Sequence, residues 1–517
     1  MAGKPAVAEK SADNPGGIGL FHLIMSVVTL VVGSGIFSLC SDMAASGSNG
    51  QGILLAWAVT AFGVTCLVVC FFVLSRVKPK MKGGIYMYAK EGFGPFVGFC
   101  SAYGYWISAI LCIVAFSSLL FGAFSTFFPD VFNPGGNNLA SIIGESIVVW
   151  FYVWLVSRGV KEAAAINAIV TIAKLVPIFT VLVIIVFAGH FHPDIFAANF
   201  SMVTGVGDDG SILFGADAAG YELDLFGQMT AAITTTMWVF VGIEAAVAIS
   251  GRAKRESDVG KATIISFACI IVLYLAMSML SLGVMPLDQL AGLDNPPLSN
   301  LMRYAVGDWG AMFVSVGVAL SLLGGLLGYT VLTAESPYEA AVEGAGFPKF
   351  FAKSNEKDAP VGLLVVNGII VEIFFVMMML SESAYQFFYT ISLGMILLPY
   401  LFSAAYMVKI AVKEPQEFAG KVKTPATVCA VVGVFGVLYS LLLTYSTGVV
   451  GLCIMSFLFV PGILIYIWGR KQAGLPYLNQ ISDKVALVVI AVAFVAAVYF
   501  LLSGQVVEGF AVMEPLF

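Results

Sequence analysis

Charged residues are scarce in this chain. Lysine, arginine, aspartate and glutamate together make up 11% of its 517 residues, compared with about 25% in an average soluble domain. Apolar residues make up 60%, which is more than a single soluble core of this length can bury. The composition therefore argues against a soluble enzyme and favours a protein whose solvent is lipid.

The residue types that build metal, redox and nucleotide sites are few or scattered. There are three histidines, and the eight cysteines lie in or beside apolar runs at irregular spacing. Such spacing matches neither a disulfide framework nor a metal cluster. The chain also lacks a phosphate-binding loop and a hydrolase nucleophile motif, which mark many nucleotide-driven and hydrolytic proteins. We therefore expect no metal, no cofactor, no nucleic-acid partner and no enzymatic activity.

Long apolar runs are what the sequence does contain. Each is long enough for an α-helix to cross a bilayer, which takes about 20 residues. Spanning strands are not expected, because the runs lack the alternation of barrel strands and isolated strands cannot satisfy their backbone in lipid. The sequence thus predicts an all-α polytopic membrane protein with about thirteen spans. The predicted spans are residues 18–44, 51–75, 96–126, 140–157, 163–188, 227–250, 262–285, 310–333, 361–381, 385–409, 426–446, 449–469 and 484–503.

The distribution of basic residues predicts the orientation of these spans. Of the 25 lysines and arginines, 23 fall in loops on one side. Arg303 lies on the other side, and Lys174 lies inside a span. Because basic residues concentrate in cytoplasmic loops, we expect a cytoplasmic N-terminus. An odd number of crossings then places the C-terminus outside, together with the 189–226 loop, which has acidic but no basic residues.

Glycines interrupt two of the spans, the first and the sixth. The first span contains Gly33-Ser34-Gly35, and the sixth contains a glycine within residues 238–244. In secondary transporters, breaks at matching positions of two repeats meet at the substrate site. The free N–H groups of a half-helix suit a carboxylate and unwound carbonyls suit an ammonium, so the two breaks together would bind the backbone of an amino acid. Alternatively, the glycines only permit close helix packing.

Several short segments resemble those of a known family, the amino acid-polyamine-organocation (APC) superfamily. These segments are residues 33–37, 83–89, 92–94 and 238–244. Residues 158–160, 250–254 and 258–263 resemble one branch of that family, the basic amino acid antiporters. The type member of this branch exchanges arginine for ornithine. The resemblance implies substrate exchange and a LeuT-type fold of two inverted five-helix repeats with additional C-terminal helices.

The resemblance also implies a division of the chain. The expected parts are a cytoplasmic N-terminal tail (1–17), a first inverted repeat (18–188), an acidic extracellular loop (189–226), a second inverted repeat (227–409) and C-terminal spans (410–517).

Roles for individual residues follow from the same resemblance. The carbonyls around Trp238 and Val241 would bind the α-amino group of the substrate, and the Trp238 side chain would close over the substrate as a gate. A tryptophan face also attracts a cationic side chain. The substrate carboxylate would be bound by the Gly33-Ser34-Gly35 break, and Ile36 would also belong to the substrate site.

Glu244 is the only acidic residue in the sixth span. A carboxylate inside the membrane is costly enough to suggest a function. The resemblance implies that Glu244 couples the substrate site to gating or proton sensing, with Tyr86, Tyr105 and Tyr400 as further gating residues. Alternatively, Glu244 is a hydrogen-bond hub that joins spans 1, 3 and 10.

The chain departs from the basic amino acid branch at several positions. Ile113 stands where relatives usually have asparagine, and Tyr329 stands where a tryptophan is common. Ala115 and Phe116 stand where the branch often has a serine-tyrosine pair. The expected pocket is therefore more apolar than in the branch. It suits the long methylene stems of arginine or ornithine, and equally a less polar amino acid and its decarboxylation product. Thr390 could line this pocket or bond back to its own helix.

Lys174 lies inside the fifth span. It is about eleven residues from the cytoplasmic start of that span, or roughly 16 Å deep, where an ammonium is expensive. Several sodium-independent members of the superfamily have a lysine at the similar position. The resemblance thus implies that Lys174 replaces a sodium ion beside the first break; alternatively, Lys174 snorkels to an interface.

Together these features predict a secondary-active antiporter of the cell membrane. It would exchange a basic amino acid for a related amino acid or amine, for example arginine for ornithine. A proton-coupled amino acid permease and a non-transporting membrane amino-acid sensor are the alternatives. The expected partners are amino acid and amine substrates and the lipid bilayer, and the sequence leaves a homodimer open.

Overall fold

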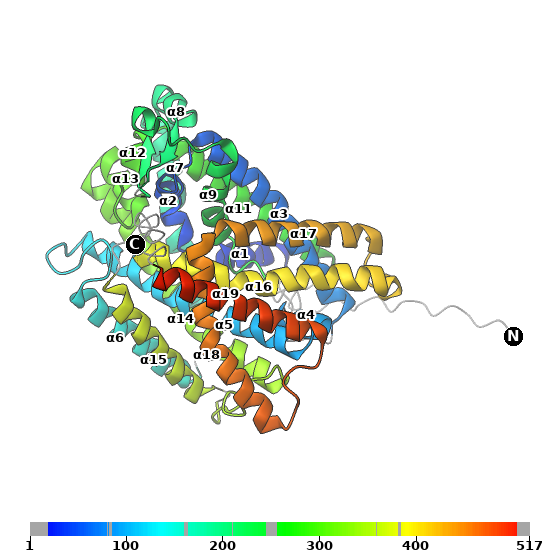
Figure 1. Ribbon diagram of the computed structural model, residues 1–517. Helices are drawn as coiled ribbons and strands as arrows, with labels where there is room; N and C mark the ends of the chain where they lie inside the picture. The colour runs from blue at the N-terminus through cyan, green and yellow to red at the C-terminus, as the bar shows by residue number, and fades with distance from the viewer. Residues whose placement is uncertain are drawn as a thin grey trace.

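The computed structural model describes residues 19–79, 81, 85–159, 164–208, 210–244, 256–357, 359–380 and 384–503. Helices dominate this part of the chain and pack into one bundle (Figure 1). Ten of the described helices are long and apolar enough to cross a membrane, which confirms the predicted all-α membrane class. They are α3 (Gly50–Val77), α5 (Pro95–Ser125), α6 (Leu139–Ser157), α11 (Glu256–Ser281), α14 (Asp308–Val342), α15 (Val361–Met378), α16 (Ala384–Lys413), α17 (Ala426–Ser446), α18 (Gly448–Ala473) and α19 (Ile481–Leu502).

The two glycine-containing spans are interrupted in the structure. The first consists of α1 (Leu20–Val31), a single 3-10 turn η1 (Gly35–Phe37) and α2 (Leu39–Ala45). The sixth begins as α9 (Leu225–Trp238), and turns follow from there to residue 244. Neither segment therefore counts among the ten long helices, although the sequence predicted a span at each.

The predicted fifth span corresponds to α7 (Ala164–Phe187). Its apolar part within the residues searched, Lys174–Phe187, is shorter than a full span. Several predicted features lie outside the described residues: the tail 1–17, the C-terminal residues 504–517, and residues 83–84, 160 and 250–254 of the family resemblance.

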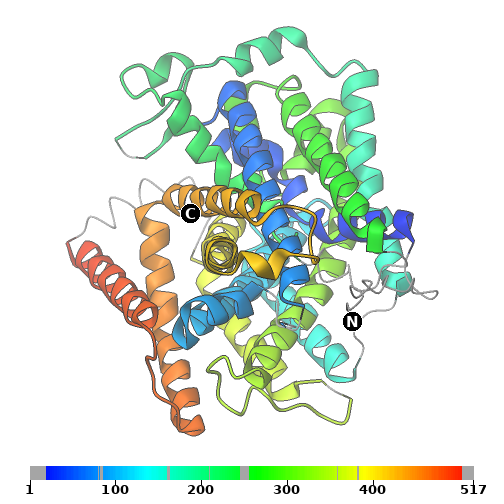
Figure 2. The same cartoon turned by 90° about the vertical axis from the view of Figure 1, so that its right-hand side faces the viewer.

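Helix α5 forms the centre of the bundle. Every residue from Phe96 to Ala123 is buried, mainly by α14, α16 and the short helix α4 (Ile85–Phe93). Gly104 allows α16 to come this close, because a Cβ there would lie 2.6 Å from the Met395 carbonyl oxygen. Figure 2 shows α16 nearly end-on near the middle of the molecule.

One end of the bundle carries short elements between the long helices, and we call it the α8 end. The opposite end, where α4 lies, is called the α4 end (Figure 1). At the α8 end, the antiparallel strands β1 and β2 pair Thr204 with Phe214. The short elements are α8 (Pro193–Phe200), β1 (Thr204–Val206), β2 (Ile212–Phe214), η2 (Gly215–Ala218), α12 (Leu287–Ala291) and α13 (Pro297–Val306).

Asn199 of α8 fastens these elements to the bundle. Its side-chain amide donates to the carbonyls of Leu282 (2.8 Å) and Met285 (2.9 Å). Its oxygen accepts from the Leu287 N–H at 3.0 Å. One buried amide thus satisfies three backbone groups between α11 and α12, which would be costly to bury unpaired.

The C-terminal helices lie at the periphery (Figure 2, orange and red). After the turn η4 (Pro415–Phe418), α17 packs on α16. Asp483 at the start of α19 accepts from the N–H groups of Phe96 (2.9 Å) and Val97 (3.3 Å), so it caps α5. The rest of α19 exposes apolar side chains such as Val488 and Val492, as expected of a helix that faces lipid.

Candidate functional site

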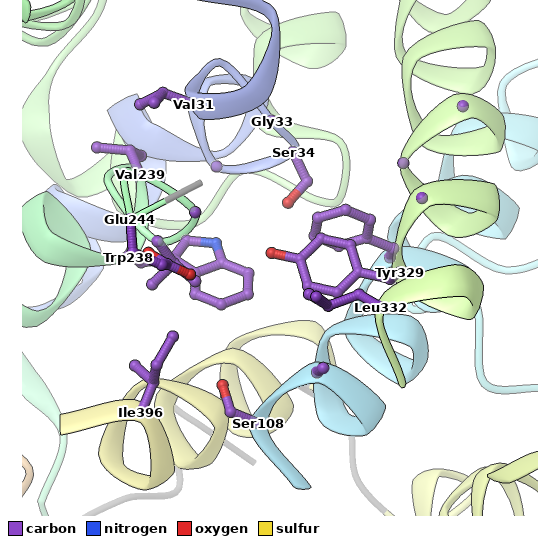
Figure 3. Close-up of a pocket in the computed structure, with 18 of the residues that line it drawn as sticks. Val31, Gly33, Ser34, Ser108, Trp238, Val239, Glu244, Tyr329, Leu332 and Ile396 are labelled. Atoms are coloured by element: carbon purple, nitrogen blue, oxygen red, sulfur yellow. The ribbon is translucent and has the colours of Figure 1, made fainter. Parts of the chain in front are cut away.

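A cavity of about 310 Å³ lies where the two interrupted segments meet α5, α14 and α16. The first break contributes Gly33 and Ser34 to its lining, and the second break contributes Trp238. Figure 3 shows that the side chains of Ser34, Trp238 and Tyr329 converge on one space. The structure therefore brings together residues that the sequence places in three separate spans.

The two glycines of the first break have different surroundings. A Cβ on Gly35 would lie 2.6 Å from Val239 Cγ1 and 2.9 Å from Trp238 Cδ1, so only glycine lets the two breaks touch here. A Cβ on Gly33 would meet nothing nearer than 3.9 Å. Close packing, the alternative considered from the sequence, thus explains Gly35 but not Gly33, which borders the open cavity.

The first break leaves backbone donors unused beside the cavity. Among the residues that the structure describes, neither the Gly33 N–H nor the Ser34 N–H has a hydrogen-bond partner. Such unpaired donors at the start of a half-helix suit an anion, because the helix dipole adds a partial positive charge. The break can therefore bind a carboxylate.

The second break borders the same cavity with residues in turns. Gly242 has φ of +100°, a conformation that favours glycine. Turn hydrogen bonds join the Val241 N–H to the Trp238 carbonyl (3.1 Å) and the Ile243 N–H to the Phe240 carbonyl (3.1 Å). Val241 and Gly242 both line the cavity.

Tyr274 of α11 holds the two breaks together. Its hydroxyl lies 3.2 Å from the Val31 carbonyl oxygen and 3.1 Å from the Val239 carbonyl oxygen, and it can donate to either. The side chain is fully buried. Sequence reasoning missed Tyr274, because nothing in its local pattern distinguishes it from an ordinary buried aromatic residue.

Aromatic rings cover the cavity toward the α8 end. The Trp238 indole stacks on Tyr389 with ring centroids 5.2 Å apart and meets Phe116 edge-on at 6.3 Å. Phe116 in turn meets the ring of Tyr329 at 5.1 Å. The Trp238 Nε1–H donates to the Tyr385 hydroxyl at 3.1 Å.

Glu244 borders the cavity toward the α4 end. Its Oε1 accepts from the Tyr105 hydroxyl at 3.1 Å, and its Oε2 accepts from the Tyr400 hydroxyl at 2.5 Å. The carboxylate therefore joins the second break to α5 and α16, which correspond to two of the three spans, 1, 3 and 10, that the hub alternative named. A hub of this kind can also act as a gate, so the geometry is compatible with both interpretations.

The remaining predicted residues lie at different distances from the cavity. Lys174, which is 5% exposed, belongs to the cavity lining together with Gly33. Ile36 and Ile113 are buried but are not among the lining residues, and Tyr86 lies in α4 near the α4 end. The Thr390 hydroxyl donates to the Gln386 carbonyl at 2.8 Å, within its own helix. Their assigned roles in transport stay predictions.

Besides the predicted Tyr329, one face of α14 contributes lining residues that sequence analysis did not identify. Its lining residues recur at helical spacing, and Glu335 brings a second carboxylate to the cavity. Gly325 packs against Phe116, where a Cβ would lie 2.8 Å from Cε2, whereas a Cβ on Gly328 would meet nothing within 4 Å. The lining residues of α14 are Ser321, Gly324, Gly325, Gly328, Tyr329, Val331, Leu332 and Glu335.

Two broken helices around one cavity are the architecture expected from the family resemblance. A family model described as amino acid permease matches residues 18–447. The chain belongs to the amino acid permease family. The predicted resemblance to the APC superfamily is thereby confirmed, and the molecule is a multi-pass membrane protein.

Named relatives of this permease match nearly its whole length. An arginine/ornithine antiporter of Pseudomonas aeruginosa is 37% identical over 91% of this chain and 94% of its own. An arginine/ornithine antiporter of Latilactobacillus sakei is 33% identical over 95% of this chain and 98% of its own. An arginine/agmatine antiporter of Chlamydia pneumoniae is 32% identical over 96% of this chain and 99% of its own. These relatives are transporters rather than enzymes.

Proposed function

We propose that this permease exchanges a basic amino acid for a related amino acid or amine across the cell membrane. Arginine and ornithine are the first pair to test, because relatives matched over most of the chain are named for that exchange. Arginine and agmatine are the second pair. The observation that carries the proposal is a single cavity bordered by unpaired backbone donors at one wall and carboxylates at others.

The backbone end of the substrate would lie between the two breaks. Its carboxylate would accept from the N–H groups of Gly33 and Ser34, which have no other partner among the described residues. Its α-amino group would donate to carbonyls near Trp238 and Val241, which border the same cavity. Opposite partial charges from the two breaks thus match the two charges of an amino-acid backbone.

The side-chain end would extend along α14. Glu335 lies six residues beyond Tyr329, which is about 9 Å along a helix, and both residues line the cavity. The apolar side chains of Val331, Leu332 and Ile396 border the same space. Such walls pack the methylene stem of arginine or ornithine, and carboxylates attract the cationic group.

Two closures would alternate around the bound substrate. Trp238 and its aromatic neighbours would close the α8 side, and Glu244 with Tyr105 and Tyr400 would close the α4 side. We infer that the α8 end faces outside and the α4 end faces the cytoplasm. Four lysines lie near the α4 end, as the positive-inside rule predicts for a cytoplasmic face. Their contacts are Lys78 with Glu414, Lys90 with the Glu343 carbonyl, Lys409 with the Gly92 carbonyl and Lys421 with Glu417.

The proposed alternation uses the predicted division into two inverted repeats, residues 18–188 and 227–409. In this arrangement Lys174 of the first repeat would take the place of a sodium ion beside Gly33. Its position in the lining of the same cavity supports that role. Transport should accordingly not require sodium.

Counterflow in proteoliposomes tests the proposed function. Liposomes preloaded with ornithine should take up labelled arginine many times faster than empty ones, because an antiporter returns through its cycle only when loaded. Replacing sodium by choline should leave the rate unchanged.

Three results would contradict parts of the proposal. Equal initial rates with and without preloading would contradict obligatory exchange and favour a permease. Binding of arginine without any uptake would identify a sensor. Stimulation by sodium would remove the role proposed for Lys174.

A further inference from the structure

We propose that Asp42 of α2 forms an outer subsite that binds the cationic group of a substrate before it reaches the central cavity. The proposal rests on the proposed exchange of basic amino acids and adds a second binding position to it. Asp42 is not part of the cavity lining described above. It lies seven residues beyond Gly35, or about 10 Å further toward the α8 end along a helix.

The Asp42 carboxylate is buried with one of its oxygens unsatisfied. The side chain is 4% exposed. Its Oδ1 accepts from the Gln386 side-chain amide at 3.0 Å. Its Oδ2 has no hydrogen-bond partner within the described part of the chain, where no lysine or arginine pairs with it either. A buried carboxylate with one neutral donor is costly, so it is expected to await a cation.

Asp42 is connected to the aromatic closure through α16. Ser38, one helical turn before Asp42, has its hydroxyl within hydrogen-bond distance of the Gly35 carbonyl (3.3 Å) and of the Tyr385 hydroxyl (3.2 Å). Tyr385 accepts from Trp238, and Gln386 is the next residue in α16. A substrate bound to Asp42 would therefore lie beside Tyr385 and Gln386. We expect both residues to move when the Trp238 side chain leaves its closed position.

A second cavity lies near the α8 end, and one of its lining residues, Asn295, contacts Gln386. The cavity has a volume of about 470 Å³, and Asp294, Asn295 and Asp308 are among its lining residues. The Asn295 Oδ1 lies 3.5 Å from the same Gln386 amide that donates to Asp42. The Gln386 side chain thus contacts both Asn295 in the outer cavity and the Asp42 carboxylate.

The charges along this path suit a cation and not an anion. Arg303 is the one basic residue that lines the outer cavity, and it is paired with Asp308 at 3.0 Å. Asp294 and Asp42 remain to attract a guanidinium or ammonium group. Because a cation at Asp42 would replace a neutral donor by a charged one, the Gln386 amide would be released and the contact beside Tyr385 loosened.

Arginine uptake into oriented vesicles tests the subsite. Right-side-out vesicles preloaded with ornithine measure the KM on the outer face, and everted vesicles from the same cells measure the KM on the inner face. Asp42→Asn keeps the size of the side chain and removes its charge. We expect it to raise the outer KM for arginine about tenfold, which corresponds to ~1.4 kcal/mol, and to leave the inner KM within about twofold of the wild type.

Two controls accompany this variant. Asp217→Asn removes one negative charge from an exposed position of η2 at the same end and should not change the outer KM. Citrulline has the shape of arginine without its charge. It should inhibit arginine uptake at the outer face equally well in the wild type and in the Asp42→Asn variant. The unchanged inner KM shows that the Asp42 variant is folded.

Other outcomes would overturn the subsite. An outer KM that stays within twofold of the wild type would show that Asp42 binds no cation. Equal increases on both faces would assign Asp42 to the fold of the gate, and an increase in everted vesicles alone would place it on the inner face. A wild-type protein that exchanges neutral amino acids but no arginine would refute the proposed function itself, and with it the need for a cation subsite.

Discussion

The central cavity is bordered by aromatic rings toward the α8 end and by a carboxylate toward the α4 end. The difference follows the course of two helices. In α16, Tyr385 and Tyr389 near its start contact Trp238, and Tyr400, farther along, bonds to Glu244. In the opposite direction along α5, Tyr105 bonds to Glu244 and Phe116 meets Trp238.

The two borders therefore respond to different signals. The aromatic side is held by ring packing and by hydrogen bonds between neutral groups, such as that of Trp238 to Tyr385, so its opening depends on the contacts that a substrate makes. The carboxylate side is held by two hydrogen bonds to an ionisable group, so its opening can also depend on a proton. Variants that separate these two dependences test the comparison.

The largest effect is expected where the first break touches the aromatic side. Gly35→Ala would place a Cβ 2.6 Å from Val239 Cγ1 and 2.9 Å from Trp238 Cδ1. Overpacking of this kind costs about 1–3 kcal/mol, and here it would push Trp238 away from Tyr385. We expect exchange to fall below detection in the counterflow assay. Gly33→Ala is the matched control for folding, because its Cβ has open space, and it should leave the Tm nearly unchanged.

Trp238→Leu should remove most substrate binding and is the next largest effect. The variant loses the stacking on Tyr389, the hydrogen bond to Tyr385 and the aromatic face offered to a cation. We expect the Kd for arginine, measured by calorimetry on purified protein, to rise about a hundredfold, or ~2.8 kcal/mol. Tyr385→Phe removes only the hydrogen bond and should cost less than tenfold. Binding that survives in the leucine variant would show that the aromatic side does not contact the substrate.

Glu244→Gln should have the smallest effect on binding and act on turnover instead. A glutamine can accept from one of the two tyrosine hydroxyls but must donate to the other, so one of the two hydrogen bonds is weakened. We expect a Kd within about twofold of the wild type and a turnover about tenfold lower, the size expected for one hydrogen bond to a charged group. The pH dependence of turnover should also flatten. Tyr400→Phe, which removes one donor and keeps the acid, should lower turnover but retain that pH dependence.

A contrary result would reverse the assignment. Loss of arginine binding in the Glu244 variant, with intact binding in the Trp238 variant, would place the substrate against the carboxylate and make the aromatic side a distant closure. Equal effects of both variants on Kd and turnover would show that the two borders act as one unit.

The class of the protein, the positions of both breaks and the presence of Trp238 and Glu244 at the second break could be predicted from the sequence. Each of these depends on local information, whereas the roles of Trp238 and Glu244 stay predictions. Apolar runs of span length, glycines inside them and single polar residues in apolar surroundings are visible in any linear reading. The family resemblance added the pairing of the two breaks, which periodicity alone does not contain.

Which face of each helix meets the cavity was decided only by the tertiary structure. Ile113 and Thr390 lie in the predicted helices, but the rotation of α5 and α16 turns Ser108, Ala109 and Ile396 toward the cavity instead. That rotation is set by close contacts such as Gly104 against the Met395 carbonyl, between residues far apart in the chain.

The contacts that join distant spans could not be predicted from the sequence either. Tyr274 reaches the carbonyls of both breaks, and Gln386 reaches Asp42, across sequence separations that no local pattern encodes. Asp42 looks like any polar residue near the end of a span until the fold buries its carboxylate beside Tyr385. The sequence determined which residues could be in the membrane, and the packing of helices decided which of them face one another, because a helix fixes the spacing of its side chains but not its rotation against its neighbours.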